Sequence, residues 1–113
     1  MNKKEIQHPD KQVDTGAYSA AVEVDGWVYV SGQGPMNMRT GQIVEGDIQT
    51  QTRVTLEHVE KILVAAGCAM EDVVKCTCHL LNFDDFEGFN EVYSQFFQGV
   101  RPARTTVQSV LFG

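Results

Sequence analysis

The sequence has few cysteines, few prolines and no long hydrophobic run. Its 113 residues include 3 Cys, 3 Pro and 10 Gly, and 42% of them are hydrophobic. This composition excludes collagen-like, low-complexity and disordered chains. An odd number of cysteines without framework spacing argues against a disulfide-stapled fold and indicates reduced thiols. We therefore expect one compact domain with a cytoplasmic location.

Positive charge is also scarce. The chain has 9 Lys and Arg against 15 Asp and Glu, which gives a formal net charge of −6. Because nucleic-acid affinity depends on a positive field, no nucleic-acid partner is expected. No window approaches 18 consecutive apolar residues, and the first ten residues lack the apolar segment of an export signal. No membrane partner is expected either.

Several short patterns predict the secondary structure. Residues 1–15 are polar without a clear period, which is typical of an N-terminal arm. Asp25-Gly26 separates two β-prone runs, 19–24 and 27–31, and predicts a hairpin because both turn residues need positive φ. Glycine and proline then predict a loop over residues 32–41.

Two helices and two further strands are predicted beyond the loop. Apolar residues at helical spacing indicate a helix from Asp47, its N-cap, to Ala66, with Gly67 as its C-cap. Residues 73–81 alternate between apolar and polar and predict a strand. A second, aromatic-rich helix is expected from Asp84 to Gly99, and a last strand over residues 104–111.

This β-β-α-β-α-β order predicts an α+β fold in which two helices cover one face of a four-stranded sheet. The opposite face would carry Thr77, Thr105 and Val107, which are too apolar or β-branched to be plainly solvated. Burial of that face against another subunit is the simplest explanation.

Two positions stand out as candidate anion-binding groups. Arg104 follows Pro102 at the entry to a strand, where a guanidinium could grip a carboxylate with two hydrogen bonds. An ordinary surface arginine is the alternative, and most charged residues are of that kind. The glycine-rich stretch 31–34 could bring backbone N–H groups close to an anion, or it could be a plain turn.

Cys76, Cys78 and His79 do not form a convincing metal site. The strand pattern puts both cysteines on one face and His79 on the other, and no second cluster supplies further ligands. We expect buried thiols there, and packing for Cys68. Asn90 lies on an aromatic helix face, so its amide needs a polar partner in the core or across an interface.

Short motifs along nearly the whole chain, from Gly16 to Leu111, resemble the Rid family of reactive intermediate deaminases, also called the YjgF-like family. Each motif is weak by itself, but the ordered set is specific. The matching stretches are Gly16-Ala17-Tyr18-Ser19-Ala20-Ala21, Val30-Ser31-Gly32-Gln33, Thr40-Gly41, Gly46-Asp47-Ile48, Gln51-Thr52, Ala65-Ala66-Gly67, Asp72-Val73-Val74-Lys75, Asp85-Phe86, Asn90-Glu91-Val92-Tyr93 and Pro102-Ala103-Arg104.

The resemblance implies a chorismate-mutase-like α+β fold with a mixed sheet, assembled as a homotrimer around an inner barrel of sheets. The active sites would lie in the clefts between subunits. Family members hydrolyse 2-imino and 2-enamino acids, such as 2-iminopropanoate and its tautomer 2-aminoacrylate, to 2-oxo acids and ammonia. The resemblance implies no metal or organic cofactor.

The same resemblance assigns roles to residues of this chain. Arg104 would hold the carboxylate of the substrate. The side chains of Tyr18 and Asn90 would shape the pocket. Backbone groups of Ser31, Gly32 and Thr106 would line it, and the carbonyl of Thr106 would accept a hydrogen bond from the substrate nitrogen.

The chain also departs from the family pattern. Family members usually continue with one more strand, which carries a glutamate thought to position water, so residues 1–113 are expected to be a single Rid-like domain that lacks this strand. Thr106 replaces a frequent cysteine, and His58 stands where asparagine is frequent. The alternatives to a small-substrate deaminase are a deaminase of a larger substrate such as 2-aminomuconate, and a non-catalytic trimer that binds small carboxylates as a regulator or acts as a holdase. Acidic net charge argues against a ribonuclease.

Overall fold

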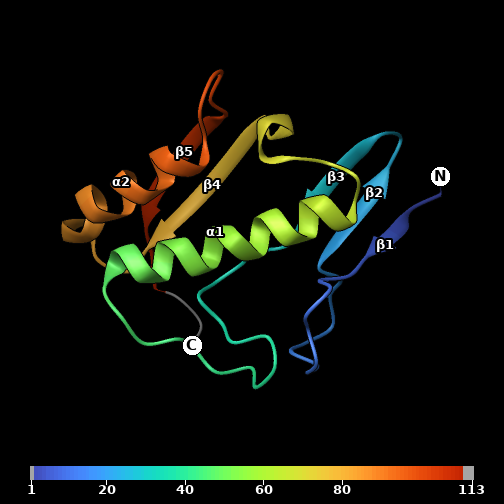
Figure 1. Ribbon diagram of the computed structural model, residues 1–113, viewed down its shortest axis with the longest axis horizontal. Coiled ribbons are helices and arrows are strands. Elements are labelled where there is room, and N and C mark those ends of the chain that lie inside the picture. Colours follow the sequence, from blue (N-terminus) through green and yellow to red (C-terminus); the bar gives the residue numbers. More distant parts are fainter. Residues whose placement is uncertain (1, 111–113) are drawn as a thin grey trace.

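The computed structural model describes residues 2–110 and has the expected α+β composition (Figure 1). Relative to the predicted order, it adds one strand at the N-terminus and two single-turn 3₁₀ helices. The elements are β1 (Lys4–Ile6), β2 (Ala21–Val24), β3 (Trp27–Val30), α1 (Ile48–Ala65), η1 (Met70–Asp72), β4 (Lys75–Leu80), η2 (Phe83–Asp85), α2 (Phe86–Phe96) and β5 (Ala103–Gln108).

The expected N-terminal arm contains a strand. Residues 4–6 form β1, which pairs antiparallel with β2 so that Ile6 lies opposite Ala21. Ile6 is buried against Ala21 and Ile62 of α1. One buried apolar side chain and the backbone pairing therefore order a segment whose polar composition hides any periodic signal.

The hairpin is confirmed at the predicted turn. Asp25 and Gly26 have φ values of 52° and 81°, and Val24 pairs with Trp27 across the turn. Positive φ at both positions is what a two-residue turn between twisted strands requires. The hairpin leaves Trp27 and Tyr29 of β3 exposed on the face away from α1.

The strands form two sheets, so the expected single four-stranded sheet is wrong for residues 2–110. The first is antiparallel with the order β1-β2-β3, and the second is the parallel pair β4-β5. Strand directions are mixed, as the fold class predicts. Helix α1 joins the two sheets, because its apolar side packs on both (Figure 1).

The core follows α1 from one sheet to the other. Leu56 and Leu63 pack with Leu80 of β4 and with the buried aromatic residues that follow α2's inner face. Next to Leu63 on the helix, fully buried Ile62 packs with the β1-β2 pair. Both helices therefore lie on the same side of their strands, as predicted.

The helix boundaries differ slightly from the prediction. Asp47 caps α1, since its Oδ1 accepts a hydrogen bond of 2.8 Å from the N–H of Thr50. The second helix is shorter than the predicted span from Asp84 to Gly99, because the Asn82 side chain accepts from the N–H of Asp84 and caps the η2 turn first. The last strand ends at Gln108, and position 111 lies outside the described residues.

No helix within residues 2–110 combines the length and the apolar character that crossing a membrane would need.

Replacing Ile62 tests the role of α1 in joining the sheets. We expect Ile62→Ala to lower the free energy of unfolding by about 2–5 kcal/mol, because the cavity would open at a fully buried contact. Val64→Ala is the control on the same helix, since Val64 is 64% exposed, and it should change stability by about 0.5 kcal/mol or less. Urea denaturation measures both. Equal effects would contradict the packing described here.

Candidate functional site

Arg104 lies on the side of β5 that faces the helices, against α2. Its Nη1 donates a hydrogen bond of 2.7 Å to Oδ1 of Asn90. The guanidinium carbon also lies 4.8 Å from the ring centroid of Tyr93, and Phe86 and Phe89 are the next nearest rings. The polar partner that the amide of Asn90 needs is therefore the guanidinium of Arg104, and the aromatic face of α2 positions this guanidinium.

The charge of Arg104 has no acidic partner among residues 2–110. Within residues 2–110, no carboxylate lies within 4.0 Å of the guanidinium, and the Asn90 contact is its one hydrogen bond. A guanidinium has five N–H donors, so most of them remain free. A half-buried cation with free donors is well suited to bind a carboxylate.

Thr106 lies two residues further along β5, on the same face as Arg104. Its Oγ1 is buried and has no hydrogen-bond partner in the described chain, and the hydroxyl of Tyr93 is in the same state. Buried hydroxyls are normally paired. The region between β5 and α2 thus holds a buried hydroxyl, that of Thr106, whose hydrogen-bonding capacity is not used by residues 2–110.

Tyr18, Ser31 and Gly32 form a second group, at the end of β3. Ser31 is fixed to the preceding segment, because its N–H donates to the carbonyl of Ala20 and its Oγ to that of Ser19. Tyr18 and Gly32 line a cavity of about 170 Å³. The other lining residues are His8, Lys11, Ala20, Gln33, Gly34, Met36, Met38 and Ile43.

Two residues near Tyr18 were missed by sequence reasoning. The Lys11 ammonium donates to Oγ1 of Thr15 at 2.6 Å and lies 5.0 Å from the centroid of the Tyr18 ring. Oγ1 of Thr15 is also 2.6 Å from the Tyr18 hydroxyl. Both belong to the polar segment 1–15, which shows no period and no motif, so only the fold brings them to Tyr18.

The structure does not bring the two groups of predicted residues together within one chain. Arg104, Asn90 and Thr106 lie between β5 and α2, whereas Tyr18 lies near the end of β3. No hydrogen bond of the described residues links the two groups. Figure 1 shows β5 beside β4 and α2, and β3 apart from them further along α1. Within one chain, the six predicted residues therefore form two separate groups.

The cysteines of β4 are partly buried thiols, as predicted. Cys76 and Cys78 both pack against the core, and burial is the main cause that raises the pKa of Cys78 to about 11. Burial also raises the pKa of Tyr93, with a smaller contribution from the neighbouring Cys76. His79 points to the other face and contacts Oγ of Ser109. In the described part of the chain, no three His, Cys, Asp or Glu side chains gather as metal ligands.

Comparison with known proteins gives consistent similarities. The profile of the family described as Endoribonuclease L-PSP matches residues 10–111. The 2-iminobutanoate/2-iminopropanoate deaminase of Rattus norvegicus is 45% identical over 93 residues, which are 82% of this chain and 68% of that protein.

Two solved structures resemble the whole fold. A Rid-family protein of unknown function from Yersinia pestis superposes with a TM-score of 0.89 at 36% identity, covering 96% of this chain and 86% of that one. TdcF from E. coli, solved with bound serine, superposes with a TM-score of 0.85 at 38% identity, covering 94% of this chain and 85% of that one.

Thiol labelling tests the burial of Cys78. Only the thiolate reacts with iodoacetamide, so a pKa of about 11 instead of 9.0 should slow the labelling of Cys78 at pH 8 by about 100-fold relative to the unfolded chain. Peptide mass spectrometry after native and urea-denatured labelling measures this ratio. Equal rates in both states would show that Cys78 is not desolvated.

Proposed function

The chain belongs to the Rid family, whose profile also carries the name endoribonuclease L-PSP, and we propose that it hydrolyses small 2-imino and 2-enamino acids to 2-oxo acids and ammonia. The observation that carries this proposal is Arg104, a half-buried guanidinium that meets no carboxylate in the described part of the chain. Relatives named as 2-iminobutanoate/2-iminopropanoate deaminases support it, since their substrates carry a carboxylate beside the imine.

In the proposed reaction, the free donors of Arg104 bind the substrate carboxylate and fix the imine carbon beside a water molecule. The water oxygen bonds to that carbon, and the electron pair of the C=N bond moves to nitrogen, which takes up a proton. The C–N bond then breaks as the C=O bond forms, and ammonia leaves. Atoms balance as imine plus water giving 2-oxo acid plus ammonia, with no oxidation or reduction.

The other predicted residues would hold the reacting atoms in place. The carbonyl of Thr106 would accept a hydrogen bond from the substrate nitrogen, and Asn90 would keep Arg104 oriented. Tyr18, with the backbone of Ser31 and Gly32, would close the pocket from the other side. Positioning of this kind accounts for a large part of the rate increase in reactions that need little side-chain acid–base chemistry.

We propose that the two groups of residues meet between subunits of a homotrimer. Their separation within one chain supports this, as does the exposed apolar face of the strands. Trp27 and Tyr29 are 58% and 64% exposed on that face, and Val107 of β5 is exposed as well. Packing the sheets of three copies into an inner barrel would bury these side chains.

A binding role without catalysis is the second candidate. E. coli TdcF was solved with bound serine, an amino acid that carries a carboxylate as the proposed 2-imino acid substrates do. A carboxylate-binding regulator would keep Arg104 and Tyr18, so turnover decides between the two roles. Ribonuclease activity is disfavoured by the net charge of −6.

Replacing Arg104 tests the deaminase proposal. 2-Iminopropanoate is generated by an amino-acid oxidase, and its loss is followed by semicarbazide trapping. We expect Arg104→Ala to lower kcat/KM by about 30-fold or more, equivalent to about 2 kcal/mol. Arg104→Lys should lie in between, because lysine keeps the charge and loses the two-pronged geometry.

Arg53→Ala is the control, since Arg53 is exposed on α1, and it should match wild type. If wild type does not exceed buffer but binds 2-oxobutanoate saturably in calorimetry, the protein is a binder and the deaminase proposal fails.

The oligomeric state tests the shared site. Light scattering should give a mass of about 38 kDa, three times the 12.6 kDa of one chain. Tyr29→Asp should produce monomers, because it would bury a charge at the proposed contact. Val64→Asp is the matched control, equally exposed on α1, and should leave the mass unchanged. A monomeric wild type would remove the shared site.

A further inference from the structure

Two histidines form a buried pair that the proposed reaction does not use. His8 follows β1 and is 5% exposed, and His58 lies on α1 and is 9% exposed. Nε2 of His8 lies 3.0 Å from Nδ1 of His58, and the rings meet edge to face. Two imidazoles at this distance can share a hydrogen bond only if one nitrogen donates and the other accepts.

The neighbours of the pair decide where its protons lie. The backbone N–H of Asp10 donates to Nδ1 of His8 at 3.0 Å, so this nitrogen carries no proton. A neutral His8 therefore carries its proton on Nε2 and donates it to Nδ1 of His58. His58 in turn donates from Nε2 to the carbonyl of Met36 at 2.6 Å. All three bonds run in one direction, and both rings are neutral.

An added proton cannot fit into this chain of bonds. On Nδ1 of His8 it would face the N–H of Asp10, and on Nδ1 of His58 it would face the donating Nε2 of His8. If His8 shifted its proton to Nδ1 in order to accept, the clash would move to Asp10. Protonation of either ring therefore breaks one of the three bonds, and a broken bond leaves a buried polar group unpaired.

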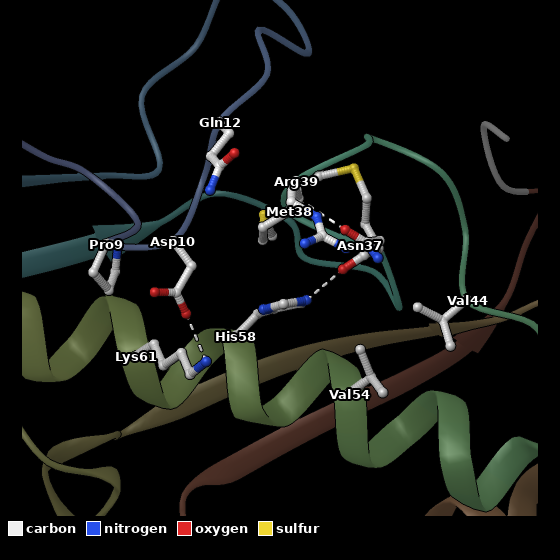
Figure 2. Close-up of a pocket in the computed structure, with 11 residues that line it drawn as sticks. Pro9, Asp10, Gln12, Asn37, Met38, Arg39, Val44, Val54, His58 and Lys61 are labelled. Carbon is white, nitrogen blue, oxygen red and sulfur yellow. Dashed lines mark hydrogen bonds and ion pairs between the residues drawn. The ribbon is translucent and has the colours of Figure 1, made fainter.

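The charges around the pair favour the neutral state. Burial is the main cause that lowers the pKa of His8 below its ordinary 6.5, followed by His58 itself. Lys61 of α1 and Lys11 also lower it, whereas the carboxylate of Asp10 raises it. Asp10 forms an ion pair of 2.6 Å with Lys61, and both side chains lie near the His58 ring (Figure 2).

The pair holds two segments that line the cavity near Tyr18. Figure 2 shows the His58 ring reaching from α1 toward the loop that contains Asn37 and Met38. Its bond to Met36 fixes that loop, and its bond to His8 fixes the start of the segment that leads to Tyr18. His8 and Met36 both line the same cavity as Tyr18. Two of the cavity's walls are thus fastened to α1 through these rings.

We propose that His8 and His58 are positioning residues for the reaction site, and that Tyr18 and the Met36 loop keep their places only while both rings are neutral. This inference rests on the proposed function, because it concerns the cavity lined by Tyr18 and Gly32. Activity should be constant while the pair is neutral and fall once it takes up a proton.

We call the state in which Tyr18 and the Met36 loop keep their places closed, and the state in which they have left them open. The direction of the pH dependence follows because the hydrogen bonds of the closed state require neutral rings. At pH values above 6.5, His8 is neutral in both the open and the closed state, and the hydrogen bonds of the pair stabilise the closed state fully. As the pH falls below 6.5, exposed histidines take up protons first, so the open state gains and the segments loosen. Because burial lowers the pKa of His8, buffer-corrected kcat/KM should stay constant above pH 6.5 and fall at lower pH as His8 takes up a proton, by about tenfold per pH unit for one proton.

The first experiment compares pH–rate profiles of the wild type and two variants. The double variant His8→Gln/His58→Gln keeps a donor and an acceptor at each position but cannot titrate, so its acid decline should be lost. Glu60→Gln is the control on the same helix as His58, because Glu60 is exposed on α1, and it should leave the decline unchanged. A double variant with the wild-type acid decline would overturn the inference.

The second experiment does not depend on activity. In ¹⁵N-histidine-labelled protein at pH 7.5, long-range ¹H–¹⁵N spectra should show protons on Nε2 of His8 and of His58, with a scalar coupling across their hydrogen bond. Acidification should abolish the coupling and shift the Tyr18 ring resonances together. If this occurs in a protein without deaminase activity, the positioning role stands and the proposed reaction fails. Charged rings at pH 7.5, or titration without change at Tyr18, would overturn the positioning role.

Discussion

The packing of α1 against two separate sheets is the constraint on which the rest of the structure depends. Among residues 2–110 no strand pairing joins β1-β2-β3 to β4-β5, so α1, together with Val30 of β3, which packs against both core clusters, holds the two halves in one body. Leu56 and Leu63 contact the β4 side and Ile62 the β1-β2 side. The apolar stripe of α1 is wide enough for neighbouring residues on the helix to pack against different sheets.

The candidate site follows from that division. Arg104 and Asn90 belong to the half formed by β5 and α2, and Tyr18 and Gly32 belong to the half that follows β3. Each half is internally well ordered, since Arg104 bonds to Asn90 and Ser31 bonds to the carbonyls before it. A guanidinium that meets no carboxylate among the described residues and a small cavity lined partly by glycines are complementary parts of a carboxylate site. In the proposed homotrimer, assembly of copies would bring these parts together.

The histidine pair adds a second kind of order to the same region. Loops that line a pocket are usually less stable than the core, because they bury few apolar side chains. Here a chain of three hydrogen bonds, from Asp10 through His8 and His58 to Met36, fastens two loops to α1. Because all three hydrogen bonds run in the same direction, they form together only while both rings are neutral, and one added proton breaks one of them.

Local patterns were sufficient to predict much of the molecule. The Asp25-Gly26 turn, the Asp47 cap and the alternation of β4 depend on φ, on a side-chain oxygen and on a period of two, all of which are visible in neighbouring residues. Motifs along the chain also identified the family, and Arg104 with Asn90 as candidate site residues. These features need no knowledge of distant contacts.

Only the tertiary structure decided the remainder. Strand β1 exists because Ile6 finds Ala21 and Ile62, and the split into two sheets depends on pairing between residues far apart in the chain. His8 and His58 are 50 positions apart and carry no shared motif, and Lys11 meets Tyr18 only through a fold of the polar N-terminal segment. A sequence determines such contacts through burial and long-range hydrogen bonds, whose partners become evident only once the chain is folded.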